Sequence, residues 1–243
     1  MGRLTVIGFG PGNFDNMTEA CKKAVEQADI VVGYSGYISL LKKFYPDKTY
    51  HETGMTGEVA RCKDAIDYAA SGENVCVVSS GDSGVYGMAC LIFELSEGLN
   101  NVDIAVIPGI TAALSGGALL GAPLSNDFAV ISLSDLLTPW ETIEKRLRAA
   151  AIGDFAICLY NPGSKTRTGH LCCACDILLE TLPEDRICGL AKNIGREGQG
   201  AALTTLKNLR DTGVSMTETV FIGNSLTKII DGRMVTPRGY KNV

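Results

Sequence analysis

The sequence predicts an α/β protein with two α/β domains, because short apolar runs alternate with amphipathic stretches and glycine-rich loops join them. Residues 4–7 form an apolar run that ends in a glycine-rich segment at 8–12, which is typical of a buried strand leaving its sheet through a tight loop. The order of strand, loop and helix then recurs through the first half of the chain, to about residue 120, whereas the end of the chain is richer in strands. Such alternation indicates parallel strands with helices on both faces of the sheet.

Apolar periodicity places the elements of each half of the chain. In the first half we expect strands at residues 4–7, 30–32, 75–78 and 104–107, and helices at 19–28, 59–69, 86–95 and 111–120. Thr18 is the predicted N-cap of the first helix. In the second half we expect strands at 128–133, 155–160, 187–191, 201–203, 219–222 and 228–236, and helices at 139–151 and 169–182. Turn-forming residues at 121–127 interrupt the pattern, so we predict domains at 1–122 and 128–243.

Composition narrows the classes of function. The chain has 243 residues, of which 46% are hydrophobic and 20% charged, so it can bury a core and is not globally disordered. Its 22 basic and 27 acidic residues give a net charge of −5, which argues against a nucleic-acid partner. No apolar run approaches the ~18 residues of a membrane span. We therefore expect a cytoplasmic protein with no membrane segment and no secretory signal.

The cysteines indicate a reducing compartment rather than a disulfide framework. There are nine, an odd number, and several lie inside apolar runs. Cys172 and Cys175 form a C-x-x-C pattern within a predicted apolar helical stripe, so we expect core thiols there rather than metal ligands. The chain has only two histidines, His51 and His170, and we expect no metal site.

The glycine-rich loop at 8–12 suggests a dinucleotide-binding fingerprint, but the match fails. Asn13 occupies the third glycine position, and Asp29 precedes the second strand instead of ending it. Pro11 also removes an N–H from the loop. A nicotinamide-linked oxidoreductase is therefore disfavoured. A plain strand-ending loop and a site for another small ligand both remain open.

Two later loops point more clearly to a ligand. Residues 79–87 and 108–112 each follow a buried strand, so they lie at the carboxyl edge of a parallel sheet, where open α/β folds bind ligands. Asp82 is either a helix N-cap or a residue that positions a ligand. Thr111 is a predicted cap of the following helix.

Together these loops resemble those of the tetrapyrrole methylase family, the S-adenosylmethionine-dependent enzymes that methylate uroporphyrinogen and the corrin precursors. The resemblance runs in order through residues 8–12, 81–87 and 108–112. Residues 132–140 and 159–167 are similar to the branch that methylates C17 and contracts the macrocycle during cobalamin synthesis. Ser83 stands where relatives often carry proline.

The resemblance implies an S-adenosylmethionine site in a cleft between the two domains, with precorrin-3B or cobalt-factor III as the substrate. It places the cofactor against Pro11, Ser80, Gly81, Asp82, Val85, Thr111, Ala112 and Asn161. Because the substrate carries many carboxylates, Lys165, Arg167 and Arg196 are the expected substrate-binding residues. The candidates for proton transfer are Asp82, Tyr86 and Asp135.

The resemblance also implies a homodimer. Two other interpretations stay open. One is a methylase of the same fold that acts on another corrin precursor or on a non-tetrapyrrole acceptor. The other is a nucleotide-binding regulatory module without turnover.

Overall fold

A computed structural model describes residues 2–164 and 167–241, so Lys165 lies outside the described residues. The chain divides into two compact units, Met1–Thr111 and Ala112–Val243, here called the N-terminal and C-terminal units. Each unit contains a five-stranded sheet with helices, which confirms the predicted α/β class. The boundary lies upstream of the predicted link at 121–127. Helix α5 (Ala112–Leu120) explains the difference, because it packs on strands β9, β10 and β11 of the second sheet.

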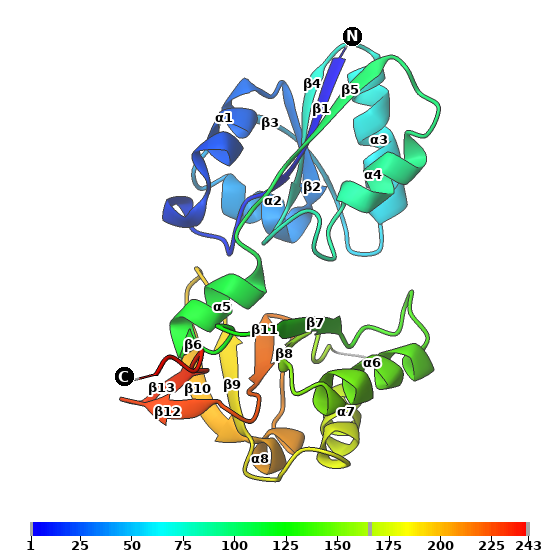
Figure 1. Cartoon of the computed structure of the whole chain (residues 1–243). Helices are drawn as coiled ribbons and strands as arrows, with labels where there is room; N and C mark the ends of the chain where they lie inside the picture. The colour runs from blue at the N-terminus through cyan, green and yellow to red at the C-terminus, as the bar shows by residue number, and fades with distance from the viewer. Residues whose placement is uncertain (1, 165–166, 242–243) are drawn as a thin grey trace. The chain divides into compact units, whose positions relative to one another are not determined.

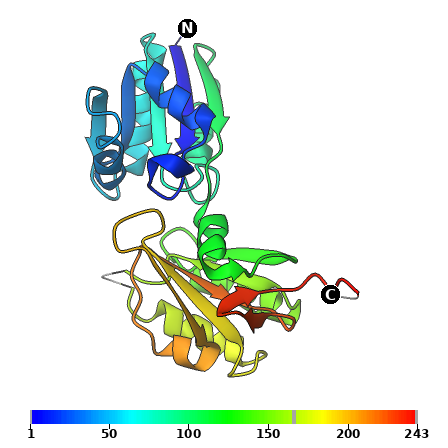
Figure 2. The same cartoon turned by 90° about the vertical axis from the view of Figure 1, so that its left-hand side faces the viewer.

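The N-terminal unit has a parallel sheet in the order β3-β2-β4-β1-β5. Its strands are β1 (Gly2–Gly8), β2 (Ile30–Tyr34), β3 (Thr49–Thr53), β4 (Asn74–Ser79) and β5 (Val102–Ile107). Helices α1 (Glu19–Gln27) and α2 (Ser35–Leu41) cover one face, and α3 (Glu58–Ala70) and α4 (Ala89–Leu95) cover the other (Figure 1). A short 3-10 turn, η1 (Phe14–Asn16), precedes α1. All five carboxyl ends therefore meet at one edge of this sheet (Figure 2).

Helix α1 begins where the sequence predicts. The Thr18 hydroxyl accepts a hydrogen bond from the Cys21 N–H at 3.2 Å and satisfies one of the free donors of the first turn. Cys21 and Val25 then bury one side of the helix against the sheet. The sequence pattern does not predict α2 and β3. Strand β3 lies at the sheet edge and carries polar side chains (TYHET), so it lacks the apolar run that marks a buried strand.

The C-terminal unit has a mixed sheet in the order β10-β9-β11-β8-β7. Only β7 (Phe128–Ser132) and β8 (Ala156–Tyr160) are parallel to each other. The other pairs are antiparallel, and their strands are β9 (Ile187–Lys192), β10 (Gly200–Thr205) and β11 (Glu218–Ile222). The parallel pattern that the first half of the chain predicts therefore does not extend to this sheet. The chain between β9 and β10 is a short turn and not a helical crossover, so these strands pair antiparallel.

Helices cover both faces of this second sheet. Helix α5 packs on one face, and α6 (Trp140–Ile152), α7 (His170–Leu179) and α8 (Leu206–Arg210) pack on the other. A small third sheet joins β12 (Lys228–Ile230), β13 (Arg233–Val235) and β6 (Gly121–Ala122). None of the helices described is long and apolar enough to cross a membrane.

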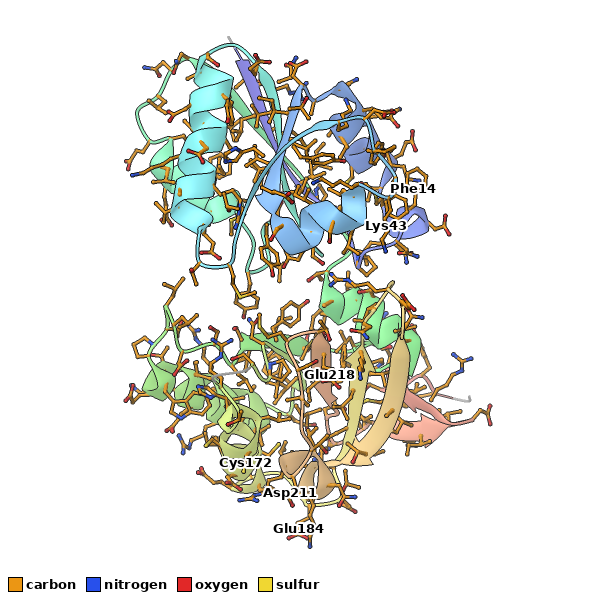
Figure 3. All side chains as sticks on the ribbon, turned by 180° about the vertical axis from the view of Figure 1, so that it is seen from behind. Phe14, Lys43, Cys172, Glu184, Asp211 and Glu218 are labelled. Carbon is orange, nitrogen blue, oxygen red and sulfur yellow. The ribbon has the colours of Figure 1, made fainter. Side chains whose placement is uncertain are left out.

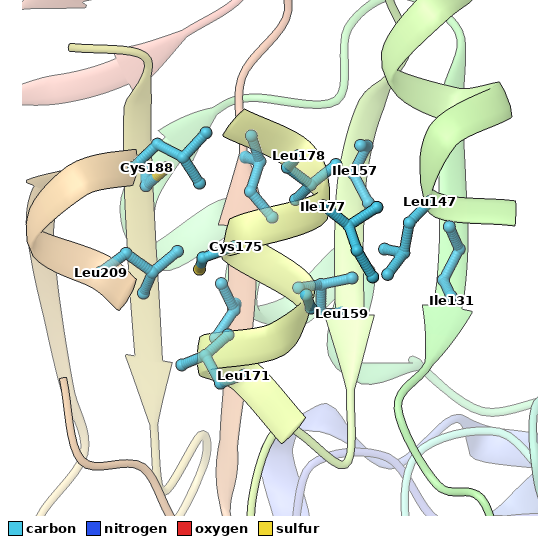
Figure 4. Packing of buried hydrophobic residues seen from close by; sticks show 14 of the residues in the cluster. Ile131, Leu147, Ile157, Leu159, Leu171, Cys175, Ile177, Leu178, Cys188 and Leu209 are labelled. Atoms are coloured by element: carbon cyan, nitrogen blue, oxygen red, sulfur yellow. The ribbon is translucent and has the colours of Figure 1, made fainter. Parts of the chain in front are cut away.

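The C-x-x-C pattern divides between the core and the surface. Cys175 points into the largest core cluster beside Leu171 and Leu209 (Figure 4), and burial raises the pKa of its thiol to about 12. Cys172 is only half-buried, and it lies on α7, where Figure 3 labels it. The prediction of a core thiol is confirmed for Cys175 and wrong for Cys172. Within the described ranges, no His, Cys, Asp and Glu side chains cluster so as to hold a metal ion.

We expect a thiol reagent to modify the exposed Cys173 of the folded protein much faster than Cys175 or Cys21. Burial raises the pKa of both Cys21 and Cys175 to about 12, so each carries almost no thiolate near pH 8. Timed alkylation followed by peptide mass spectrometry measures the order, and the same reaction in denaturant is the control. Equal rates for Cys173 and Cys175 in the folded protein would contradict the structure.

Candidate functional site

Three loops meet at the carboxyl edge of the N-terminal sheet. Strand β1 lies between β4 and β5, and each of the three strands continues into a glycine-containing loop. The first two loops pair through a two-residue bridge. The Gly10 N–H donates to the Gly81 carbonyl at 3.0 Å, and the Gly81 N–H donates back to Gly10 at 2.7 Å. The loops are therefore joined through their backbones.

Glycine is required here because the loops approach one another closely. A Cβ atom on Gly109 would overlap the carbonyl oxygens of both Gly81 and Gly8. Gly81 also has a φ of 67°, in the left-handed region that favours glycine. Packing of the loops thus explains part of the glycine pattern without any ligand. A valine at Gly81 would disturb the loops themselves.

Asp82 links the second loop to the third. Its Oδ1 accepts a hydrogen bond from the Gly84 N–H at 2.8 Å, and its Oδ2 accepts one from the Gly109 N–H at 2.9 Å. It is not the N-cap of α4, whose N-cap is Met88. Since both carboxylate oxygens accept from backbone donors, the geometry favours a positioning role over the proton transfer named in the sequence analysis.

The second loop also holds two unusual residues. Tyr86 is 56% exposed and has a φ of 55°, a conformation that costs a bulky residue on the order of 1–3 kcal/mol. Ser83 is fully buried, and its hydroxyl has no hydrogen-bond partner among the residues described. Backbone strain of this kind is found most often at functional sites.

A second group of polar residues lies at one edge of the C-terminal sheet, where parallel strands β7 and β8 end. Ser132 is the last residue of β7 and pairs with Tyr160. Asn161 follows directly with a φ of 53°, and its Nδ2 donates to the Ser132 hydroxyl at 2.9 Å. The Tyr160 hydroxyl accepts from the Ala113 N–H at 2.7 Å, which places the start of α5 beside the end of β8.

The register brings Arg196 to the same edge of this sheet. Strand β11 pairs Val220 with Leu159 near the end of β8, and it pairs Glu218 with Lys192 at the end of β9. The turn that follows β9 contains Arg196, which is half-buried. The predicted substrate-binding residue therefore shares an edge with Asn161.

The side chains of Asp135 and His170 face each other at this edge. The His170 Nε2 lies 3.2 Å from the Asp135 Oδ2, with side chains 21% and 39% exposed. The hydrogen bond from His170, aided by the charge of Arg167, holds the pKa of Asp135 below its ordinary value. Arg167 follows β8, and its Nε is buried without a partner among the described residues. The sequence does not predict His170 as a site residue, because a lone histidine in a helical pattern carries no spacing signal.

The structure thus divides the predicted site residues between the units. Pro11, Ser80, Gly81, Asp82, Val85, Tyr86 and Thr111 belong to the loops of the N-terminal unit. Ala112, Asp135, Asn161, Arg167 and Arg196 belong to the C-terminal unit. Lys165 is not described.

We expect Asp82→Ala to lower the free energy of unfolding by about 1.5–3 kcal/mol, because it leaves the Gly84 and Gly109 N–H groups without their charged acceptor. Urea unfolding measures the change. Asp82→Asn should lose less, since an amide oxygen still accepts one bond.

The neighbouring variant Ser83→Ala is the matched control. It removes a buried hydroxyl without a described partner, so stability should stay the same or rise. An Asp82→Ala variant as stable as the unmodified protein would show that the carboxylate does not hold the loops.

A family model and the known relatives of this chain agree on one protein family. The model for tetrapyrrole (corrin/porphyrin) methylases matches residues 3–210. A probable cobalt-factor III C(17)-methyltransferase of Salmonella typhimurium is 48% identical over 238 residues, covering 98% of this chain and 99% of that protein. A precorrin-3B C(17)-methyltransferase of a Sinorhizobium species is 38% identical over 248 residues, covering 98% and 97%.

Solved structures agree with these relatives. The crystal structure of the methyltransferase CobJ matches with a TM-score of 0.90 and 38% identity, covering 98% of this chain and 100% of that one. A uroporphyrin-III C-methyl transferase from Thermus thermophilus, solved with bound S-adenosyl homocysteine, shares the fold with a TM-score of 0.70 and 18% identity, covering 91% and 92%. The family model and the full-length relatives place the chain, as its loops predict, in the tetrapyrrole (corrin/porphyrin) methylase family.

Proposed function

We propose that the chain transfers a methyl group from S-adenosylmethionine to C17 of a tetrapyrrole, with contraction of the macrocycle, in cobalamin biosynthesis. The substrate is cobalt-factor III or precorrin-3B. The observation that carries this proposal is similarity over the whole chain to methyltransferases whose names specify C17 of these two compounds. The chain is a methyltransferase of the same class as these relatives.

The loops of the N-terminal unit fit a cofactor that is recognised through backbone groups. Gly8, Gly81 and Gly109 leave no side chain where the loops approach, so peptide N–H and C=O groups form that surface. The proposed contacts in this unit are Pro11, Ser80, Gly81, Asp82, Val85 and Thr111. Ala112 and Asn161 are the proposed contacts in the C-terminal unit. The predicted cleft between the units stays a proposal.

The edge of the C-terminal unit has the chemistry that a tetrapyrrole needs. Arg167 and Arg196 offer guanidinium groups, which bind carboxylates through two parallel hydrogen bonds. Beside Asp135, Leu136 and Leu137 are 74% and 98% exposed, which suits contact with the flat apolar ring. Lys165 is proposed as a further cation from the sequence alone.

The protein's own contribution to methyl transfer is orientation. When bound, the sulfonium cofactor supplies the methyl group and needs no protein nucleophile. Holding an acceptor carbon in line at near-attack distance lowers the barrier by roughly 7–11 kcal/mol. Rigid loops are suited to this role, and the Asp82 hydrogen bonds provide that rigidity in the N-terminal unit.

Incubation with labelled S-adenosylmethionine and each tetrapyrrole in turn tests the proposal. We expect label in cobalt-factor III or precorrin-3B, found at C17 by carbon-13 NMR. Label only in another corrin precursor or in a non-tetrapyrrole acceptor would favour the alternative methylase. Cofactor binding without any turnover would favour a regulatory module.

We expect Arg167→Ala to weaken tetrapyrrole binding while S-adenosylhomocysteine binding stays nearly unchanged. Loss of one charged hydrogen-bond partner costs about 1.5–3 kcal/mol, or roughly 10- to 150-fold in the dissociation constant. Arg167→Lys should recover only part of the loss, because an ammonium lacks the planar fork.

Calorimetric titration of each ligand measures these effects. Arg233→Ala, at an exposed position of β13, is the control and should change neither affinity. Weaker cofactor binding with unchanged tetrapyrrole binding in Arg167→Ala would place Arg167 at the cofactor instead.

We also propose that the protein forms a homodimer and that it is located in the cytoplasm.

A further inference from the structure

The two histidines of the chain each face a carboxylate, and their surroundings differ in one respect. In the N-terminal unit, the His51 Nε2 lies 2.9 Å from the Asp64 Oδ2, and the Tyr68 hydroxyl lies 3.3 Å from the His51 Nδ1. Both ring nitrogens of His51 therefore have partners. This pair lies on β3 and α3, away from the glycine loops, and is complete within the protein.

In the second pair, one ring nitrogen of the histidine has no partner among the described residues. The His170 Nε2 faces the Asp135 Oδ2 at 3.2 Å, but no described residue partners the His170 Nδ1. That nitrogen is also not among the buried polar atoms that lack a partner, so it has access to solvent. The Trp140 ring meets the imidazole edge-on, with centroids 5.0 Å apart, and restricts its rotation. Asp135 and Trp140 therefore hold the His170 ring in place, while its Nδ1 faces solvent.

The charges around this ring favour a proton acceptor. The pKa of Asp135 lies below its ordinary value, chiefly because of the hydrogen bond from His170, so Asp135 is a carboxylate at neutral pH. A carboxylate on one nitrogen fixes the tautomer that leaves the other nitrogen unprotonated, and it stabilises the imidazolium that forms on protonation. The geometry around His170 matches a base with an orienting partner.

We propose that His170 is a catalytic residue that accepts a proton from the tetrapyrrole through its Nδ1, and that Asp135 is its positioning residue. The proposal rests on the proposed function. When an acceptor carbon takes a methyl group from a sulfonium, a C–C bond forms, an S–C bond breaks and the sulfur keeps the electron pair. The macrocycle thereby gains one positive charge. Loss of one proton from the macrocycle to the His170 Nδ1 restores its charge, and solvent later removes that proton.

The location of His170 supports this role. His170 begins α7 after β8, and Asp135 lies in the loop after β7, so both share the edge that carries Asn161, Arg167 and Arg196. The substrate carboxylates are proposed to bind at that edge.

Steady-state kinetics of His170→Gln, with His51→Gln as the matched control, test the proposal. We expect His170→Gln to lower kcat by about 10²–10⁴-fold, the usual contribution of a general base. The dissociation constants of S-adenosylhomocysteine and the tetrapyrrole should change by less than about threefold, because a base contributes mainly in the transition state. His51→Gln should leave kcat unchanged, since both nitrogens of His51 already have partners.

Two further variants separate catalysis from structure. Added imidazole should restore part of the turnover of His170→Ala, which a residue needed only for packing would not allow. Asp135→Asn should lower kcat by itself but add little to His170→Gln, because the two residues act as a unit. Urea unfolding of every variant shows whether the fold is kept.

The outcomes distinguish this proposal from the one on which it rests. If the unmodified enzyme methylates C17 and His170→Gln does so at the same rate, His170 is not the base and the proposed function stands. A folded His170→Ala that imidazole does not restore at all would likewise overturn the proposal. If the unmodified enzyme methylates no tetrapyrrole, both proposals fail.

Discussion

The carboxylate of Asp82 is the interaction on which the N-terminal edge depends. A parallel sheet brings the ends of β1, β4 and β5 together, but three loops that meet there must still satisfy their backbone donors. Asp82 accepts from one N–H in its own loop and from Gly109 in the next. Glycine removes the side chains that would keep the backbones apart. The result is a surface made of peptide groups with a fixed shape.

The two units solve different chemical problems with the same architecture. In the N-terminal unit the loops meet through their backbones, which suits a ligand recognised by shape and by peptide hydrogen bonds. In the C-terminal unit the edge carries functional side chains, among them Asn161, Arg167 and His170. Left-handed residues occur at both edges, at Tyr86 and at Asn161. Asn161 turns the chain directly after β8, whereas Tyr86 lies within the loop between β4 and α4.

Much of the fold could be predicted because buried strands and amphipathic helices have strong periodic signals. Residues 4–7, 75–78 and 155–160 are apolar because helices cover both faces of their sheets, and Thr18 caps its helix through local chemistry alone. Strand β3 escaped prediction because an edge strand needs no apolar run. The direction of the antiparallel strands in the second sheet could not be predicted, because it depends on how the connecting chain runs. Apolar periodicity does not encode that path.

The candidate site likewise has features that the sequence predicts and features that it does not. Glycine loops after strands are visible in a sequence, whereas the partner of a side chain is not. Asp135 and His170 are separated by a helix, a strand and a loop, and only the pairing of β7 with β8 brings them together. The unit boundary is a similar case, since α5 follows the N-terminal loops in sequence but packs on the other sheet.

That boundary has a thermodynamic consequence. Residues 108–111 are both the third loop of the N-terminal edge and the covalent connection to the C-terminal unit, and the Asp82 carboxylate fixes Gly109 within them. Any molecule that orders this loop also reduces the conformational entropy of the connection. Affinity at the N-terminal edge and freedom of the connection are therefore linked quantities, so a cut or an insertion within residues 108–111 would change the binding free energy through this entropy as well as through any contact that it alters.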